Sequence, residues 1–161
     1  MSDIKTILYA TDFGKYTRPA FRMAVNLAKQ HDAKIIFLYV IEPLNANTVS
    51  IINAYMPTGT IEELYQESVE ELHNQAHERI NKFCQEELRG EEFPGGKPDP
   101  EIVEGSPAET ILKIADKKDA DLIVMGSHAH GVLDNLFIGS VADKVVNRSK
   151  KPVLLVPLKS D

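Results

Sequence analysis

A stretch of glycine and serine residues in the last third of the chain has the residue types and spacing of a phosphate-binding loop. Gly126 directly follows an apolar run, residues 122–125, which is typical of a buried strand. Gly139 and Ser140 then open a pattern of valines spaced like the inner face of a helix. Glycines let the backbone approach an anion closely, and a helix N-terminus supplies free amides and a positive dipole. Ser140 can add a hydroxyl at or near the N-cap. This stretch therefore predicts binding of a nucleotide or another phosphate compound.

The common nucleotide-binding and catalytic motifs are absent from the sequence. No lysine precedes Ser140, which excludes the P-loop pattern, and no Gly-x-Gly-x-x-Gly run follows the first apolar segment. There is also no Gly-x-Ser-x-Gly turn that would expose a nucleophilic serine. The acids expected near the phosphate loop are Asp12 and Asp134. The sequence therefore does not indicate an enzyme with a dedicated catalytic site, although slow phosphate hydrolysis is not excluded by it.

The spacing of the loop resembles that of the universal stress protein family, whose ATP-binding members carry the pattern Gly-x2-Gly-x9-Gly-Ser/Thr. Gly126, Gly139 and Ser140 match this pattern, and Ala129 stands where the family has its second glycine. Five segments are similar to the family's strands and turns, in the same order along the chain: residues 7–13, 37–41, 104–108, 120–128 and 151–157. Matches in this order are far more specific than any one of them.

The resemblance implies a fold, a ligand and an assembly. The implied fold is a single α/β, Rossmann-like domain (adenine nucleotide alpha hydrolase-like) over residues 1–161, with a five-stranded parallel sheet of order 3-2-1-4-5 and helices on both faces. The implied ligand is ATP, or ADP or AMP, with Mg²⁺ or Mn²⁺. The implied assembly is a homodimer whose nucleotide occupancy regulates a stress response. The residues expected to bind the nucleotide are Ala10, Thr11, Asp12, Val40, Met125, Gly126, His128, Ala129, Gly131, Gly139, Ser140 and Val141.

Several of these residues also have a purely structural explanation. Beside phosphates, Asp12 would hold a divalent metal or a ribose hydroxyl; otherwise it caps the helix that begins near Thr17, or forms an Asx turn. Val40 is either an apolar wall for adenine or ordinary core. The resemblance favours the functional role for both. His128 and His130 are two residues apart, but a loop without a third ligand does not indicate a metal site.

The composition indicates an ordinary globular chain. It has 161 residues, of which 43% are hydrophobic and 26% charged, close to the average for a single domain. A formal net charge of −6 does not favour nucleic acids or anionic membranes as partners. No apolar run approaches the length of a membrane span, and the first residues lack the apolar core of a signal peptide. The single cysteine, Cys84, excludes an internal disulfide, and we expect a cytoplasmic protein.

Apolar and amphipathic segments alternate along the chain, which predicts a parallel sheet with helices on both faces. In such sheets ligands bind beyond the carboxyl ends of the strands, where the direction of winding switches. The first and fourth strands should flank this point, so that the Asp12 turn and the Gly126 loop meet in one crevice. We expect a loop at residues 44–59, which are rich in turn formers, and a connector at 90–100, with three prolines and three glycines. The expected strands are residues 4–10, 34–41, 101–104, 122–125 and 153–158; the expected helices are residues 17–30, 60–88 and 140–148, and one capped by Ser106.

The residue types and spacings leave two classes of function open. The chain is either a nucleotide-binding regulatory protein, or an interaction module whose phosphate loop no longer binds a nucleotide. Ala129 is the residue that separates them, because a Cβ is costly where the loop requires a positive φ. A flavin-binding carrier of flavodoxin shape is a weaker third class, since the phosphate-loop match is poor.

The last strand is expected at an edge of the sheet and is apolar on both faces from Val153 to Leu158. An exposed edge of this kind invites pairing with another chain. Pro157 lacks an N–H, which limits how far such pairing extends. The resemblance implies that two copies pair these strands across a two-fold axis.

Overall fold

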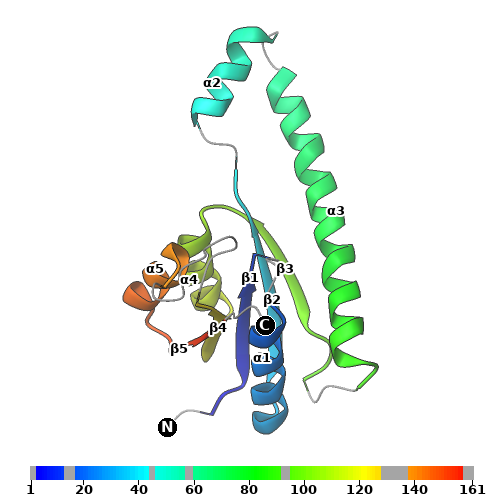
Figure 1. The fold of residues 1–161 in the computed structure, drawn as a ribbon, viewed down its shortest axis with the longest axis vertical. Coiled ribbons are helices and arrows are strands. Elements are labelled where there is room, and N and C mark those ends of the chain that lie inside the picture. The colour runs from blue at the N-terminus through cyan, green and yellow to red at the C-terminus, as the bar shows by residue number, and fades with distance from the viewer. Residues whose placement is uncertain are drawn as a thin grey trace.

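The computed structural model describes residues 3–12, 17–43, 46–56, 60–91, 95–127 and 138–157. Five parallel strands form one sheet in the order β3-β2-β1-β4-β5, which confirms the predicted fold class and strand order (Figure 1). The strands are β1 (Thr6–Thr11), β2 (Lys34–Ile41), β3 (Asp99–Glu104), β4 (Leu122–Gly126) and β5 (Val153–Val156). The helices are α1 (Arg18–His31), α2 (Ala46–Tyr55), α3 (Thr60–Leu88), α4 (Pro107–Lys117) and α5 (Ser140–Arg148).

Side chains on the two faces of the sheet pack into two separate cores. Ile7 and Tyr9 of β1 face the helices α1 and α3, where they pack with Phe21 and Ile80. The alternate residues of β1, such as Leu8, face α4 and α5. Both faces of the central strands are therefore covered, which explains why the sequence of these strands is continuously apolar instead of alternating. Among the described residues, no helix combines the length and hydropathy that crossing a bilayer requires.

The strand and helix boundaries agree with those expected from the sequence to within two residues at most positions. β3 begins at Asp99, two residues before its expected start, because Asp99 and Pro100 already pair with β2. β5 ends at Val156 and is shorter than expected; Leu158 lies outside the described residues. α5 begins at Ser140 with Gly139 as its N-cap, so Ser140 is the first helical residue and not the cap.

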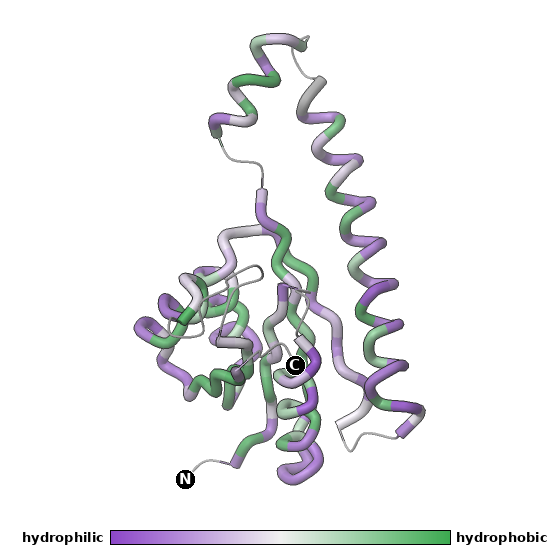
Figure 2. Tube along the Cα trace, viewed as in Figure 1, coloured by the Kyte–Doolittle hydropathy of each residue, from purple (hydrophilic) through white to green (hydrophobic). Residues whose placement is uncertain are grey.

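The prediction of a loop at residues 44–59 is wrong, because residues 46–55 form the helix α2. Its asparagines are poor helix formers, but propensity is a weak guide where tertiary contacts are available. α2 lies alongside the first half of α3, and apolar side chains of both helices line one groove. α2 and the first half of α3 extend beyond the carboxyl end of β2 (Figures 1 and 2). We call α2 and residues 60–72 of α3 the arm.

The second half of α3 is attached to α1 by apolar and charged contacts. Phe83 packs edge-on against Phe21, with ring centroids 5.0 Å apart, and the Arg18 guanidinium lies 5.3 Å from the Phe83 ring centre. Glu87 receives hydrogen bonds from both Arg18 and Arg22, the latter at 2.8 Å from Nε. Its side chain is only 5% exposed. These contacts fix the base of α3, from which the arm extends.

Candidate functional site

The winding direction of the sheet reverses between β1 and β4, and the residues that follow these strands meet there. From β1 the chain crosses to β2 and β3 on one side and then returns to β4 and β5 on the other. β1 ends at Thr11 and is followed by Asp12, while β4 ends at Gly126. The N-termini of α4 and α5 begin beside the same crevice. Such a switch point is where open α/β sheets hold their ligands.

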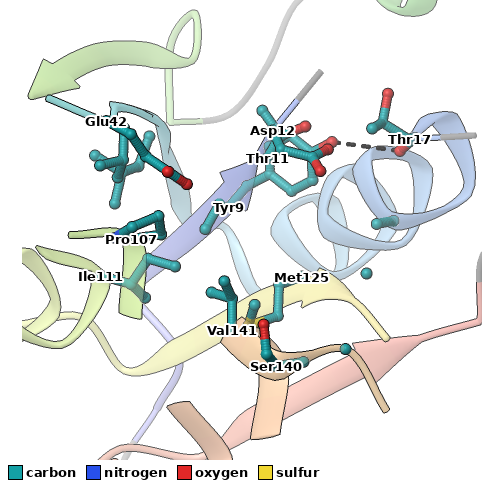
Figure 3. Close-up of a pocket in the computed structure, with 17 residues that line it drawn as sticks. Tyr9, Thr11, Asp12, Thr17, Glu42, Pro107, Ile111, Met125, Ser140 and Val141 are labelled. Atoms are coloured by element: carbon teal, nitrogen blue, oxygen red, sulfur yellow. Dashed lines mark hydrogen bonds between the residues drawn. The ribbon is translucent and has the colours of Figure 1, made fainter. Parts of the chain in front are cut away.

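A pocket of about 290 Å³ occupies this crevice, near the lower end of the range for small-molecule sites (Figure 3). All nine described residues that the sequence singled out line this pocket. They come from four elements and the turns beside them, and they are far apart in the sequence. The nine residues are Ala10, Thr11, Asp12, Val40, Met125, Gly126, Gly139, Ser140 and Val141. The three other expected site residues, His128, Ala129 and Gly131, lie outside the described residues.

One part of the pocket wall is apolar and another part is polar. Leu38 and Val40 of β2, Ile111 of α4 and Met125 of β4 supply apolar surface of the kind that receives a planar base. The polar side chains belong to Thr11, Asp12, Thr17, Glu42 and Ser140. Figure 3 shows Glu42 and Ile111 on one side of the pocket and Thr17 on the opposite side. The arrangement suits an amphipathic ligand with an apolar end and a polar end.

The N-terminus of α5 supplies the donors on the polar side. The N–H groups of Ser140, Val141 and Ala142 are the first of the helix and have no acceptor within it, because the first intrahelical bond runs from Asp143 N to Gly139 O at 2.9 Å. The Gly139 N–H differs, since it donates to the Ser127 carbonyl at 2.7 Å. An anion at this helix end would therefore bind the amides of the first helical residues, and the Ser140 hydroxyl, rather than the Gly139 amide.

Gly139 contributes space rather than an unusual backbone conformation. Its φ of −60° and ψ of 154° are values that any residue adopts. Glycine is therefore not required by the backbone at this position. Because Gly139 lines the pocket and caps α5, a side chain here would stand beside the free amides and limit the approach of an anion.

The described pocket lining carries two carboxylates, from Asp12 and Glu42, and neither lysine nor arginine. The dipoles at the N-termini of α4 and α5 are thus the main positive contribution from this part of the chain. In the described part of the chain, no three His, Cys, Asp or Glu side chains group together as metal ligands would. Mg²⁺ does not need such a group, since it usually binds one or two carboxylates together with substrate phosphates. Asp12 fits that role.

Tyr9 positions the beginning of α1 at the pocket. Its hydroxyl donates a hydrogen bond to the Thr17 carbonyl at 3.3 Å, shown by the dashed line in Figure 3. Burial raises the pKa of the Tyr9 phenol well above its ordinary value. The phenol therefore stays neutral at physiological pH and is suited to holding Thr17 at the start of α1, not to accepting protons.

Eight of the lining residues were not predicted from the sequence. Glu42 follows the end of β2 as Asp12 follows β1, so its position after a strand was a signal that could have been used. Pro107 opens α4 at the pocket, as its place after Gly105 and Ser106 indicates. The others are core residues at strand ends or on inner helix faces. The full set is Tyr9, Thr17, Ala20, Leu38, Glu42, Pro107, Ile111 and Ala142.

Comparisons with known proteins identify one family. The profile of the universal stress protein family matches residues 3–157. The chain is 34% identical over 152 residues to universal stress protein MJ0531 of Methanocaldococcus jannaschii, covering 94% of the chain and 81% of that protein. It is 31% identical to MJ0577 of the same organism, covering 97% and 96%. A solved structure of MJ0577 superimposes with a TM-score of 0.77 at 29% identity, covering 99% of this chain and 100% of that one. The chain therefore belongs to the universal stress protein family.

Proposed function

We propose that the chain binds an adenine nucleotide, ATP in the first place, in the crevice between β1 and β4. The observation that carries the proposal is the convergence of nine predicted residues from distant parts of the sequence on one pocket. That pocket combines an apolar wall with the free amides of a helix N-terminus, which are the two features that a base and a phosphate chain need. A nucleotide satisfies both at once.

In the proposed complex the base lies against Val40 and Ile111, and the phosphates lie at the N-terminus of α5. Asp12, after β1, holds a divalent cation together with the phosphate oxygens, as Mg²⁺ requires. The cation supplies positive charge that offsets the phosphates, which the described lining does not provide from its own side chains. Gly126 is a further proposed contact to the nucleotide, as are His128, Ala129 and Gly131, which lie outside the described residues.

Solved structures of family members support the choice of adenine. One universal stress protein has been solved with cAMP, and one from Archaeoglobus fulgidus with dAMP. These two proteins are 24% and 19% identical to this chain, with TM-scores of 0.56 each, so the likeness itself shows the fold alone. They establish that this fold accommodates adenine nucleotides in other chains, and the pocket described above makes the same ligand class reasonable here.

We further propose that the protein is a regulatory homodimer in which nucleotide occupancy is the signal. The pocket lining offers no arrangement of a nucleophile with a base among its described residues, so binding rather than turnover is the expected activity, with at most slow hydrolysis. The alternative function is an interaction module without a nucleotide, which would follow if Ala129 blocks the loop.

Calorimetry of stripped protein with ATP and Mg²⁺ tests the proposal, with Gly139→Val as the variant. Valine adopts the observed φ and ψ of residue 139, so the backbone need not change. We expect wild type to bind ATP and the variant to lose at least about tenfold in affinity, with unchanged circular dichroism. ATP binding of equal strength in a folded Gly139→Val protein would show that the nucleotide does not occupy this crevice. Mass spectrometry of the nucleotide that co-purifies would identify which adenine compound is bound.

A further inference from the structure

The arm presents an apolar groove of about 540 Å³ that lies outside the nucleotide pocket. Ile51, Ile52 and Tyr55 of α2 form one wall, and Leu64 and Val69 of α3 belong to the other. The foot of the groove reaches Ile41 and Glu42 at the end of β2. The arm lies above the sheet in Figure 1, so the groove is separate from both cores of the sheet.

Large apolar side chains on the arm are unusually exposed. Tyr55 is 87% exposed and Ile51 63% exposed, and Met56, Leu64 and Leu72 are each more than two-fifths exposed. These five make up most of the eight large apolar side chains that are exposed in the described part of the chain. No described residue of α2 is buried. A contiguous patch of exposed apolar side chains is typical of an interaction site.

Contacts with the sheet and with α1 hold α3, which forms one wall of the groove. Val69 is buried, and the Tyr65 hydroxyl donates a hydrogen bond to the Glu104 carboxylate of β3 at 3.2 Å. The ion pairs of Glu87 with Arg18 and Arg22 fix the far end of α3. A wall that is fixed before a partner binds loses less conformational entropy on binding than one that must be ordered.

The charge around the groove selects the kind of partner. Between residues 46 and 72 the sequence has five glutamates and neither lysine nor arginine. All five glutamates are exposed: Glu62, Glu63, Glu67, Glu70 and Glu71. A second arm would bring five further negative charges against these, and an anionic membrane would be repelled in the same way. A partner must therefore be apolar on the side that enters the groove and cationic on the sides that flank it.

We propose that the arm is a docking site for a cationic amphipathic helix of another protein. Such a helix places apolar residues at positions i, i+3, i+4 and i+7 in the groove, as in other complexes of a helix with a groove. α2, with ten residues, is about 15 Å long, so the groove accommodates about three turns of the partner helix. Lysines or arginines beside the apolar stripe then face Glu62 and Glu71, which flank the groove residues of α3 at helical spacing.

A synthetic helix of leucine and lysine, about 18 residues long, tests the proposal by fluorescence anisotropy with the full chain. The apolar variant is Ile51→Ser with Leu64→Ser, and its matched control is Met23→Ser with Val146→Ser, which removes two exposed apolar side chains elsewhere. The charge variant is Glu62→Lys with Glu71→Lys, the two exposed glutamates that flank the groove residues of α3. Its matched control is Glu78→Lys with Asp116→Lys, which changes two exposed acids outside the groove.

We expect both arm variants to weaken peptide binding by about tenfold or more, and both controls to stay within about twofold of wild type. A leucine and glutamate peptide of the same pattern should not bind. Equal binding by the arm variants and their controls, or no binding by wild type, would overturn the proposal. It would also be overturned if sedimentation shows that the arm variants dissociate a wild-type oligomer, because the groove would then be an interface between copies.

Discussion

At the scale of single residues, the two carboxylates of the pocket have different expected effects on ATP. A unit charge about 8 Å from the phosphates, at an effective dielectric of about 40, contributes about 1 kcal/mol. Without a divalent cation, Asp12→Asn and Glu42→Gln should therefore each tighten ATP binding by up to about fivefold. With Mg²⁺, Asp12→Asn should bind more weakly than wild type, because it loses a ligand of the cation. With Mg²⁺, Glu42→Gln should still bind ATP more tightly than wild type.

Calorimetry in EDTA and in Mg²⁺ measures this difference, and Glu42→Gln serves as the matched control for charge. If the two variants respond to Mg²⁺ in the same way, Asp12 does not hold the cation. It would then have the structural role that the sequence also allowed, as a cap or turn residue before α1.

Ala129 replaces the second glycine of the family pattern, and the question is whether this replacement weakens ATP binding. If residue 129 has a positive φ, Ala129→Gly should tighten ATP binding by at most about tenfold, since the left-handed conformation costs alanine about 1–2 kcal/mol. If φ is negative, the change should be neutral or slightly harmful through added loop entropy. A loop that binds no ATP in either variant would favour the interaction module.

At the scale of secondary-structure elements, Glu87 is the contact whose loss should most affect the attachment of α3. Burial alone would raise the pKa of Glu87, but hydrogen bonds from Arg22 and Arg18 outweigh it and hold the pKa below the ordinary value of 4.5. A lowered pKa in the folded state means that the ionised form stabilises the fold. That contribution is present above pH 4.5 and is lost as the pH falls through the pKa of the folded protein.

We therefore expect Glu87→Gln to lower the free energy of unfolding at pH 7 by about 1–2 kcal/mol. The difference from wild type should shrink as the pH falls below 4.5 and through the lowered pKa of Glu87, where the wild-type carboxylate also becomes protonated. Glu86→Gln is the matched control, because Glu86 pairs with the same Arg18 at 3.2 Å but its side chain is 47% exposed. Its effect should be about 0–0.5 kcal/mol. Urea unfolding at pH 7 and at acidic pH measures the stability of both variants. Equal losses of stability for Glu86→Gln and Glu87→Gln would contradict this role of Glu87.

The buried strands could be predicted from the sequence because the central sheet requires continuous apolar segments. β2 was predicted to the residue, and Gly126 and Gly139 both line the pocket at the switch point. α2 was missed because its residues are held against α3 by contacts that are distant in sequence. Glu42 and Pro107 were missed at the pocket because their approach depends on where β2 ends and α4 begins in space, although the place of Glu42 directly after a strand was a usable signal. More of the pocket lining was therefore predicted at the ends of β1 and β4 and at the start of α5 than on the wall formed by β2 and α4.

At the scale of the whole molecule, the two edges of the sheet differ in a way that favours dimerisation through β5. β3 carries Asp99, Pro100, Glu101 and Glu104, which discourage pairing with another strand. β5 has the sequence Val-Leu-Leu-Val, and its first three residues are only half-buried. An apolar edge strand that is left partly exposed is expected to be covered by a second copy, in an isologous contact.

We expect wild type to sediment as a dimer at micromolar concentration, and Val153→Lys with Leu155→Lys to yield monomers or insoluble protein. The physical reason is the repulsion of like charges across the two-fold axis. Met23→Lys with Val146→Lys adds the same charge at exposed positions elsewhere and should remain dimeric. Sedimentation equilibrium measures the mass of wild type and of both double variants. A monomer mass for wild type would contradict the proposed dimer, and with it the proposal that the dimer signals nucleotide occupancy.

The proposed nucleotide site lies at the N-terminus of α5, in the crevice between β1 and β4. Backbone amide chemical shifts, measured by NMR during titration with ATP and Mg²⁺, report this location residue by residue. We predict the largest shifts at Gly126, Ser140, Val141 and Ala142, with smaller shifts at the same amides when AMP replaces ATP, because fewer phosphates reach the helix end. Unshifted amides at Ser140 and Val141 under saturating ATP, or shifts confined to the arm, would contradict the account.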